Sequence, residues 1–221
     1  MTVDKPFRWL IGGVLLGAIA VVPIAIHDSN HSGNGASQAR KDARAFVKEY
    51  RLSRNSHFRA AQEFKRLKDG VPVIGFEIII DQDPPRYSNS SGSNQHFIFA
   101  GYQVNCAKTD VDLQCSKQSA ASWPEMVDGE ARDLENYFFS SAPIYSVKRQ
   151  KNDCFQLQNI YPEYPSPPYG DSARFCFDKK THVPVSKDVV RGHFSDVNEY
   201  TNIAAPQEAD FKLPAEAKNL P

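Results

Sequence analysis

The sequence predicts an α+β domain in which two helices cover one face of a curled antiparallel β-sheet. The order of patterns along the 221 residues is one helix, several strands, a second helix and further strands. The strand patterns are joined by short links, which favours antiparallel pairing of neighbours. An aromatic content of 11%, with 15 prolines and only two methionines, also suits strands and stiff loops better than a helical bundle.

The chain begins with a membrane-targeting pattern. Residues 9–26 (WLIGGVLLGAIAVVPIAI) carry no charge, and as a helix they would extend about 27 Å, close to the roughly 30 Å of a bilayer core. Lys5 and Arg8 precede this segment, which predicts a cytoplasmic N-terminus and an extracytoplasmic remainder. Residues 1–26 are therefore predicted to be a signal anchor, giving a single-pass protein of the cytoplasmic or inner membrane.

A cleaved signal peptide is the alternative. Ala18-Ile19-Ala20 has the small-x-small pattern of a signal peptidase site, and cleavage after Ala20 would give a secreted or periplasmic protein. In both cases residues 27–38, rich in Ser, Gly and Asn, are predicted to be a flexible linker. The extracytoplasmic domain is then expected to occupy residues 39–221.

Two helices are predicted within this domain. Apolar residues at steps of three and four predict an amphipathic helix over about 36–53. Ser122-Trp123-Pro124-Glu125 forms a capping box with proline in the first turn, which predicts a second helix over about 123–139.

Strands are predicted from alternating apolar residues. The predicted strands are 58–67, 71–81, 96–105, 144–150, 154–160, 173–178, 183–190 and 193–203. In 71–81, Ile74, Phe76 and Ile78 share one side while valine and isoleucine also occupy the other, so the sheet has apolar residues on both faces. Residues 82–94 are predicted to be a long turn-rich loop, and 106–115 a hairpin.

The four cysteines all follow the targeting segment, as expected for disulfides in an oxidising compartment. Three pairings are possible, and local patterning favours Cys106 with Cys115 and Cys154 with Cys176. In an antiparallel pair that places Cys154 opposite Cys176, Phe155 would lie opposite Phe175. The cysteines are therefore predicted to form two structural disulfides and no redox or metal site.

Charge and motifs argue against several classes of function. The 26 basic residues balance the 26 acidic ones, so the chain has no net positive charge that would favour binding to nucleic acid. The sequence lacks the nucleophile-elbow motif, the dinucleotide-binding motif, the P-loop and the zinc-protease motif. The six histidines are not spaced as metal ligands are. The acids at 81 and 83, and at 110 and 112, alternate as in calcium loops but lack the remaining EF-hand residues. We expect no enzyme activity, no cofactor and no metal.

The C-terminal strands carry a family resemblance. The stretch 154–217, with CFQLQ, RFCFDKKTHVPVS, HFSDVNEYTNI and DFKLPAEA, resembles the last strands of the LolA-like superfamily, which includes periplasmic lipoprotein carriers and the LppX/LprG cell-envelope lipoproteins. The closing hairpins of these proteins have a carboxylate, two residues, Thr, usually Gly, and then Pro. Asp178, Thr181 and Pro184 match these positions, whereas His182 replaces the glycine. The chain also lacks a lipobox cysteine near its targeting segment.

The resemblance implies an incomplete β-barrel wrapped around two helices, with an apolar cavity that takes lipid or lipoprotein acyl chains. Eight apolar residues are the candidate cavity lining, with plain core packing as the alternative: Ile74, Phe76, Ile78, Phe97, Phe99, Phe155, Phe175 and Phe177. The Pro- and Tyr-rich loop 161–169 is either a rigid rim presenting Tyr161, Tyr164 and Tyr169, or a stiff connection.

The sequence is compatible with two functions. The first is a membrane-tethered extracytoplasmic protein that binds lipid or lipoprotein acyl chains for envelope transport. The second is a sensory or regulatory ectodomain that binds an envelope protein partner without lipid cargo, as related folds do beside anti-sigma factors. An open cavity large enough for acyl chains would favour the first.

Overall fold

The computed structural model describes residues 33–217 except 93, 110 and 111, and these residues form one compact unit. The predicted targeting segment and the first part of the predicted linker lie outside the described residues. No helix among the described residues combines the length and apolarity needed to span a bilayer.

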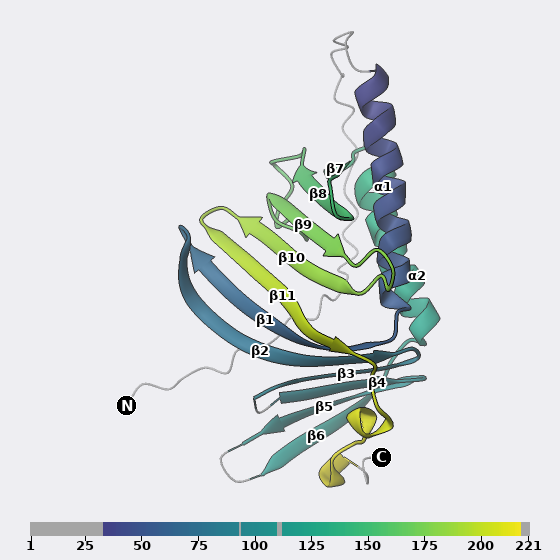
Figure 1. Cartoon of the computed structure of the whole chain (residues 1–221), viewed down its shortest axis with the longest axis vertical. Helices are drawn as coiled ribbons and strands as arrows, with labels where there is room; N and C mark the ends of the chain where they lie inside the picture. The colour runs from purple at the N-terminus through teal and green to yellow at the C-terminus, as the bar shows by residue number, and fades with distance from the viewer. Residues whose placement is uncertain (1–32, 93, 110–111, 218–221) are drawn as a thin grey trace. The chain divides into compact units, whose positions relative to one another are not determined.

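Within the described residues, eleven strands form one antiparallel sheet, which curls around the helices (Figure 1). The strands are β1 (Phe58–Lys68), β2 (Val71–Asp83), β3 (Arg86–Ser91), β4 (Asn94–Phe99), β5 (Tyr102–Lys108), β6 (Leu113–Ser119), β7 (Tyr145–Arg149), β8 (Cys154–Asn159), β9 (Ser172–Phe177), β10 (Pro184–Arg191) and β11 (Phe194–Ala204). Their order is β6-β5-β4-β3-β2-β1-β11-β10-β9-β8-β7, so β6 and β7 are its two edges. This arrangement confirms the predicted α+β class and the incomplete barrel.

Two helices, α1 (Gly33–Arg54) and α2 (Trp123–Phe139), lie side by side on the concave side of the sheet (Figure 1). The predicted bounds of α2 are confirmed, and the backbone N–H of Ser122 donates to Glu125 2.8 Å away. Helix α1 begins three residues earlier than predicted, so residues 33–38 of the predicted linker are helical. Once packing holds the rest of α1 as a helix, each residue that extends the helix gains one backbone hydrogen bond. This gain offsets the weak helix propensity of Gly, Asn and Ser.

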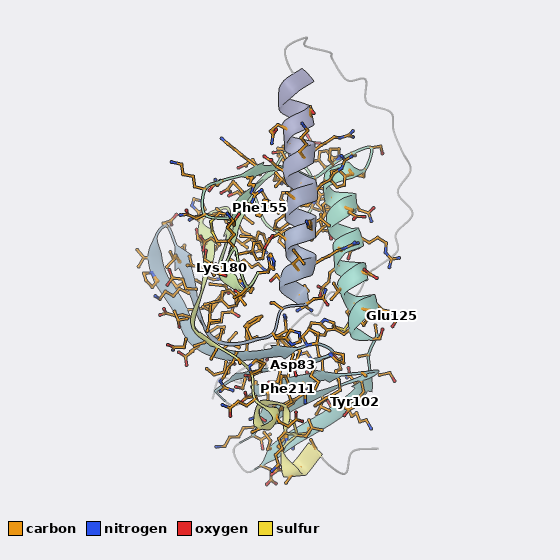
Figure 2. The ribbon with its side chains drawn as sticks, turned by 45° about the vertical axis from the view of Figure 1, so that its right-hand side comes forward. Asp83, Tyr102, Glu125, Phe155, Lys180 and Phe211 are labelled. Carbon is orange, nitrogen blue, oxygen red and sulfur yellow. A yellow bond between two sulfur atoms is a disulfide. The ribbon has the colours of Figure 1, made fainter. Side chains whose placement is uncertain are left out.

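The ring of Phe46 on α1 lies at the centre of the main core and is fully buried. It contacts Phe138 of α2 and, on the sheet, Phe155 and Phe175, with ring centroids 5.8, 5.4 and 5.1 Å away. Figure 2 shows Phe155 among the side chains that fill the space between the sheet and the helices. These aromatic contacts attach α1 to the β8–β9 end of the sheet.

The opposite, convex face of the sheet is covered in part by the C-terminal segment. Two short 3-10 helices, η1 (Glu208–Phe211) and η2 (Ala215–Ala217), lie along strands β3 to β6. Phe211 is buried there (Figure 2), and the guanidinium of Arg86 lies 4.6 Å from its ring centroid. The guanidinium of Arg59 bridges the carboxylates of Asp81 and Asp210, although burial raises the pKa of Asp81. The C-terminal segment is thus held to the sheet by both apolar and ionic contacts.

The prediction of a loop over 82–94 is wrong, because it contains β3. The polar side chains of β3 find partners within the sheet: the hydroxyl of Ser88 donates to Asp81 at 3.2 Å, on the buried side of the strand. Likewise the single strand predicted over 96–105 is two strands, β4 and β5. Gly101 between them has a φ of 83°, a conformation that turns the chain and that glycine adopts readily.

Both predicted disulfides are confirmed, Cys106–Cys115 between β5 and β6 and Cys154–Cys176 between β8 and β9. The predicted register is confirmed as well, since Cys154 pairs with Cys176 and Phe155 with Phe175. The cysteines lie on the convex face of these strands and the phenylalanines on the concave face. Each disulfide therefore joins two neighbouring strands on the face of the sheet that points away from the helices.

The β9–β10 turn shows how histidine replaces the glycine of the family pattern. His182 has a φ of 59°, in the left-handed region that a glycine would occupy without strain. Its Nδ1 lies 2.6 Å from the carboxylate of Glu49 on α1. Asp178 completes the turn by accepting the backbone N–H of Thr181 at 2.8 Å, and this bond lowers the pKa of Asp178. The histidine thus ties the hairpin to the helix.

We expect His182→Ala to lower the free energy of unfolding by about 1 kcal/mol, because it removes the contact with Glu49 and keeps the left-handed backbone. His182→Gly loses the same contact but relieves the backbone strain, so its free energy of unfolding should stay closer to wild type. Urea denaturation of both variants measures the difference. A glycine variant less stable than the alanine variant would contradict this account of the turn.

Candidate functional site

A cavity of about 180 Å³ lies between α1 and the concave face of the sheet. Its apolar wall consists of Phe58, Ile80, Phe175, Phe177 and Pro184. Its polar wall consists of Tyr50, Ser53, Arg54, Gln82, Tyr87, Ser186, Lys187 and Tyr200. The cavity is therefore amphipathic, and not purely apolar as the resemblance implied.

Most polar groups of this wall are held by neighbours within the protein. Arg54 donates to the carboxylate of Glu130 on α2 at 2.8 Å, and the hydroxyl of Tyr50 donates to the same carboxylate at 3.1 Å. Gln82 donates to the carbonyls of Ser53 and Ser56, both at 2.8 Å. These bonds fix the end of α1 against the sheet.

Burial raises the pKa values of the tyrosines around the cavity, so their phenols stay protonated at neutral pH. Burial is the main cause for Tyr50, where the negative charge of Glu130 adds to it, and burial also raises the pKa of Tyr87 and Tyr200. The cavity therefore offers neutral hydroxyls as well as the cationic side chain of Lys187.

A row of partly exposed apolar side chains continues from the cavity along the same face. In the register of β1 and β2, Phe64 pairs with Phe76, and their rings are stacked with centroids 4.7 Å apart. Ile78 lies two residues from Phe76 toward the cavity, and Ile74 two residues from it toward the hairpin tip. We call Phe64, Ile74, Phe76 and Ile78 the apolar strip.

Neither helix covers the apolar strip in the way that α1 covers β7 to β9. Figure 1 shows the β1–β2 hairpin extending away from the helices. Ile74 is 48% exposed, whereas Ile80, four residues after Phe76 on the same face, is 7% exposed. The strip is thus an open apolar surface that leads directly into the cavity.

The structure distributes the eight candidate cavity residues among four places. Phe175 and Phe177 line the cavity, and Phe155 lies behind them in the core around Phe46. Ile74, Phe76 and Ile78 belong to the apolar strip. The structure thus brings six of the eight onto the concave face.

Phe97 and Phe99 do not line the cavity. They lie on the convex face, where Phe97 is buried with Val104, Cys106 and Ala217. Their neighbour Ile98 points inward and packs against α2. The side chains of successive residues alternate between the two faces of a strand. The concave face of β4 is therefore formed by Ile98 and its alternate neighbours, which were not among the candidate residues.

The three candidate rim tyrosines have different environments. Tyr169 packs edge-on against Phe175, with centroids 5.4 Å apart, and its backbone N–H donates to the hydroxyl of Tyr145 at 2.8 Å. Tyr164 is partly buried against the main core, and Tyr161 is 41% exposed. Only Tyr169 therefore lies beside residues of the cavity.

Sequence reasoning missed the polar half of the site. The signal for Lys187 was present, because it lies two residues before the buried Val189 and so shares its face of β10. Tyr200 and Tyr87 face the cavity from β11 and β3, a strand that was itself not predicted. Nothing in the local pattern indicates that these residues meet, because their strands lie far apart in the sequence.

No protein-family model matches this sequence, and no curated protein is significantly similar to it. Among solved structures, the lipoprotein LppX of Mycobacterium tuberculosis is 11% identical, with 76% of this chain and 99% of LppX covered and a TM-score of 0.43. MucB is 12% identical, with 80% and 64% covered and a TM-score of 0.42. A LolA superfamily protein from Nitrosomonas europaea is 7% identical, with 78% and 95% covered and a TM-score of 0.33. The likeness concerns the fold alone.

Proposed function

We propose that this chain is an extracytoplasmic binding protein that holds an acyl chain against the concave face of its sheet. The observation that carries the proposal is the apolar strip, which is open to solvent and continuous with the cavity. Each methylene moved from water onto such a surface contributes about 0.8 kcal/mol at full burial, so a long chain would bind without any covalent step. The proposal therefore includes no enzymatic activity.

A charge placed on the strip tests this function. We expect Phe76→Asp to weaken binding of a fluorescent fatty acid at least tenfold, because the carboxylate must lose water when the chain covers it. Ile79→Asp is the matched control, since Ile79 lies on the opposite face of the same strand and is also partly buried. Equal losses in both variants, or no loss in Phe76→Asp, would contradict the proposal. Circular dichroism of both variants verifies the fold.

We further propose that residues 1–26 tether the domain to the membrane. The uncharged segment 9–26 and the basic residues before it support the tether. A tethered protein should remain in the membrane fraction through a high-salt wash. Release of a form beginning near Val21 would show instead that the signal is cleaved and that the carrier diffuses freely.

A regulatory domain that binds a protein partner is the second candidate. The hairpin between β1 and β2 favours it, because Val71 and Val73 at its tip are 63% and 51% exposed. Replacing both valines with serine separates the two functions. A partner-binding domain would lose its partner, whereas an acyl-chain carrier would keep its affinity for a fatty acid.

A further inference from the structure

The ammonium of Lys187 is an unmatched charge at the cavity. Lys187 is partly buried, and its Nζ lies 5.5 and 5.8 Å from the ring centroids of Phe175 and Tyr169. Across the part of the chain that the structure describes, no acceptor lies within hydrogen-bonding distance of this ammonium. Burial lowers the pKa of Lys187, and the positive charge of Arg191 lowers it further.

The nearest carboxylates are already neutralised by arginines. Glu130 binds Arg54, with Nε 2.8 Å from its carboxylate. Asp196 binds both Arg66, at 2.6 Å, and Arg191, at 3.2 Å. Both carboxylates that act on the charge of Lys187 thus already bind guanidinium groups, and neither forms an ion pair with the lysine. An anionic group of a ligand could therefore pair with the ammonium without displacing either carboxylate from its arginine.

The sheet register connects Lys187 to the apolar strip. Lys187 pairs with Asn198, Asn198 with Phe64, and Phe64 with Phe76, so these side chains lie on adjacent strands of the concave face. On the other side Lys187 pairs with Phe175 of the cavity wall. Neighbouring strands are about 4.8 Å apart, which places the strip within roughly 10–15 Å of the lysine.

We infer that the ligand is an acyl chain with an anionic headgroup, a carboxylate or a phosphate, whose oxygens contact Lys187 while its tail lies along the apolar strip. The inference rests on the proposed acyl-chain function and names the class of lipid. The cavity volume of about 180 Å³ supports this placement. Ligand sites that enclose a drug-sized molecule have about 300–1,000 Å³, so a long tail must leave the cavity along the open strip.

Photolabelling of the full-length protein in membranes tests the inference. Three probes carry the same diazirine- and alkyne-bearing acyl chain: a fatty acid, the corresponding fatty alcohol and a phosphatidylglycerol. We expect labelling by at least one anionic probe to exceed labelling by the alcohol about tenfold, consistent with a charge-assisted bond in a desolvated site. Which anionic probe is preferred distinguishes a free fatty acid from a phospholipid.

The Lys187→Gln variant should lose this preference, so that all three probes label it as the alcohol labels wild type. Lys187→Arg, which keeps the charge, should retain the preference. Lys148→Gln is the matched control, because Lys148 is an exposed lysine on the convex face of β7. Protease resistance of each variant in the same membranes verifies that it is folded.

The position of the label provides an independent readout. Trypsin releases the whole β2 side of the strip as the peptide 69–86, which we expect to carry most of the label. Equal labelling of wild type by acid, phospholipid and alcohol would overturn the headgroup inference and leave the acyl-chain function standing. A preference unchanged in Lys187→Gln, or a label concentrated outside 69–86, would also overturn it. Labelling by none of the probes would overturn the proposed function itself.

Discussion

Replacing Phe46 with alanine is expected to lower the free energy of unfolding by about 3–5 kcal/mol, the range for deleting a fully buried aromatic side chain. The ring contacts both α2 and the sheet, including Phe138, Phe155 and Phe175, so the cavity left behind cannot be filled by the movement of one neighbour. Because these contacts hold α1 in place, the variant should also lose the shape of the cavity between α1 and the sheet. Urea denaturation measures the loss of stability.

Leu52→Ala is the control for this prediction. Leu52 lies on the same helix but is 36% exposed, and surface substitutions usually change stability by no more than about 0.5 kcal/mol. A loss for Phe46→Ala as small as the loss for Leu52→Ala would contradict the role assigned to the aromatic core.

Replacing both Cys154 and Cys176 with alanine removes their disulfide and is expected to lower the free energy of unfolding by about 3 kcal/mol. The bond closes a loop with a sequence separation of 22, and both cysteines are buried between the strands that support Phe155 and Phe175. The double variant lacking Cys106 and Cys115 should lose roughly 0.8 kcal/mol less, because its loop separation is only 9.

Urea denaturation of the two double variants and wild type measures both losses. The matched comparison separates loop closure from the general effect of removing two cysteines. If loss of the shorter-loop disulfide is the more damaging, loop closure does not account for the difference. The position of each disulfide, at the edge of the sheet or near the core, would then determine how much stability is lost.

The α+β class and the disulfide pairing could be predicted because they depend on local patterns. The capping box at Ser122 defines the start of α2, and alternation around Cys154 and Cys176 defines their register. Strand β3 was missed because Ser and Asn usually favour turns, and only its pairing with β2 and β4 satisfies them. Tertiary pairing thus overrides local propensity where side-chain partners come from other strands.

The candidate site could be predicted only in part, because alternation shows which residues of a strand share a face but not which face is the concave one. Phe97 and Phe99 were therefore expected on the concave face and lie on the convex one, where Phe97 is buried. Hydrophobicity alone also cannot identify a lysine as part of a cavity. The position of Lys187 follows from its pairing with Phe175 and Asn198, on two strands that the sequence separates from it by turns.

Native mass spectrometry shows whether the domain holds an acyl lipid. A protease site inserted within residues 27–32 of the full-length protein would release the folded domain from membranes without detergent. We expect a released domain that carries one acyl lipid, which is lost in Phe76→Asp and retained in Ile79→Asp. A bare protein mass in wild type, with no acyl lipid extractable from the sample, would contradict this expectation.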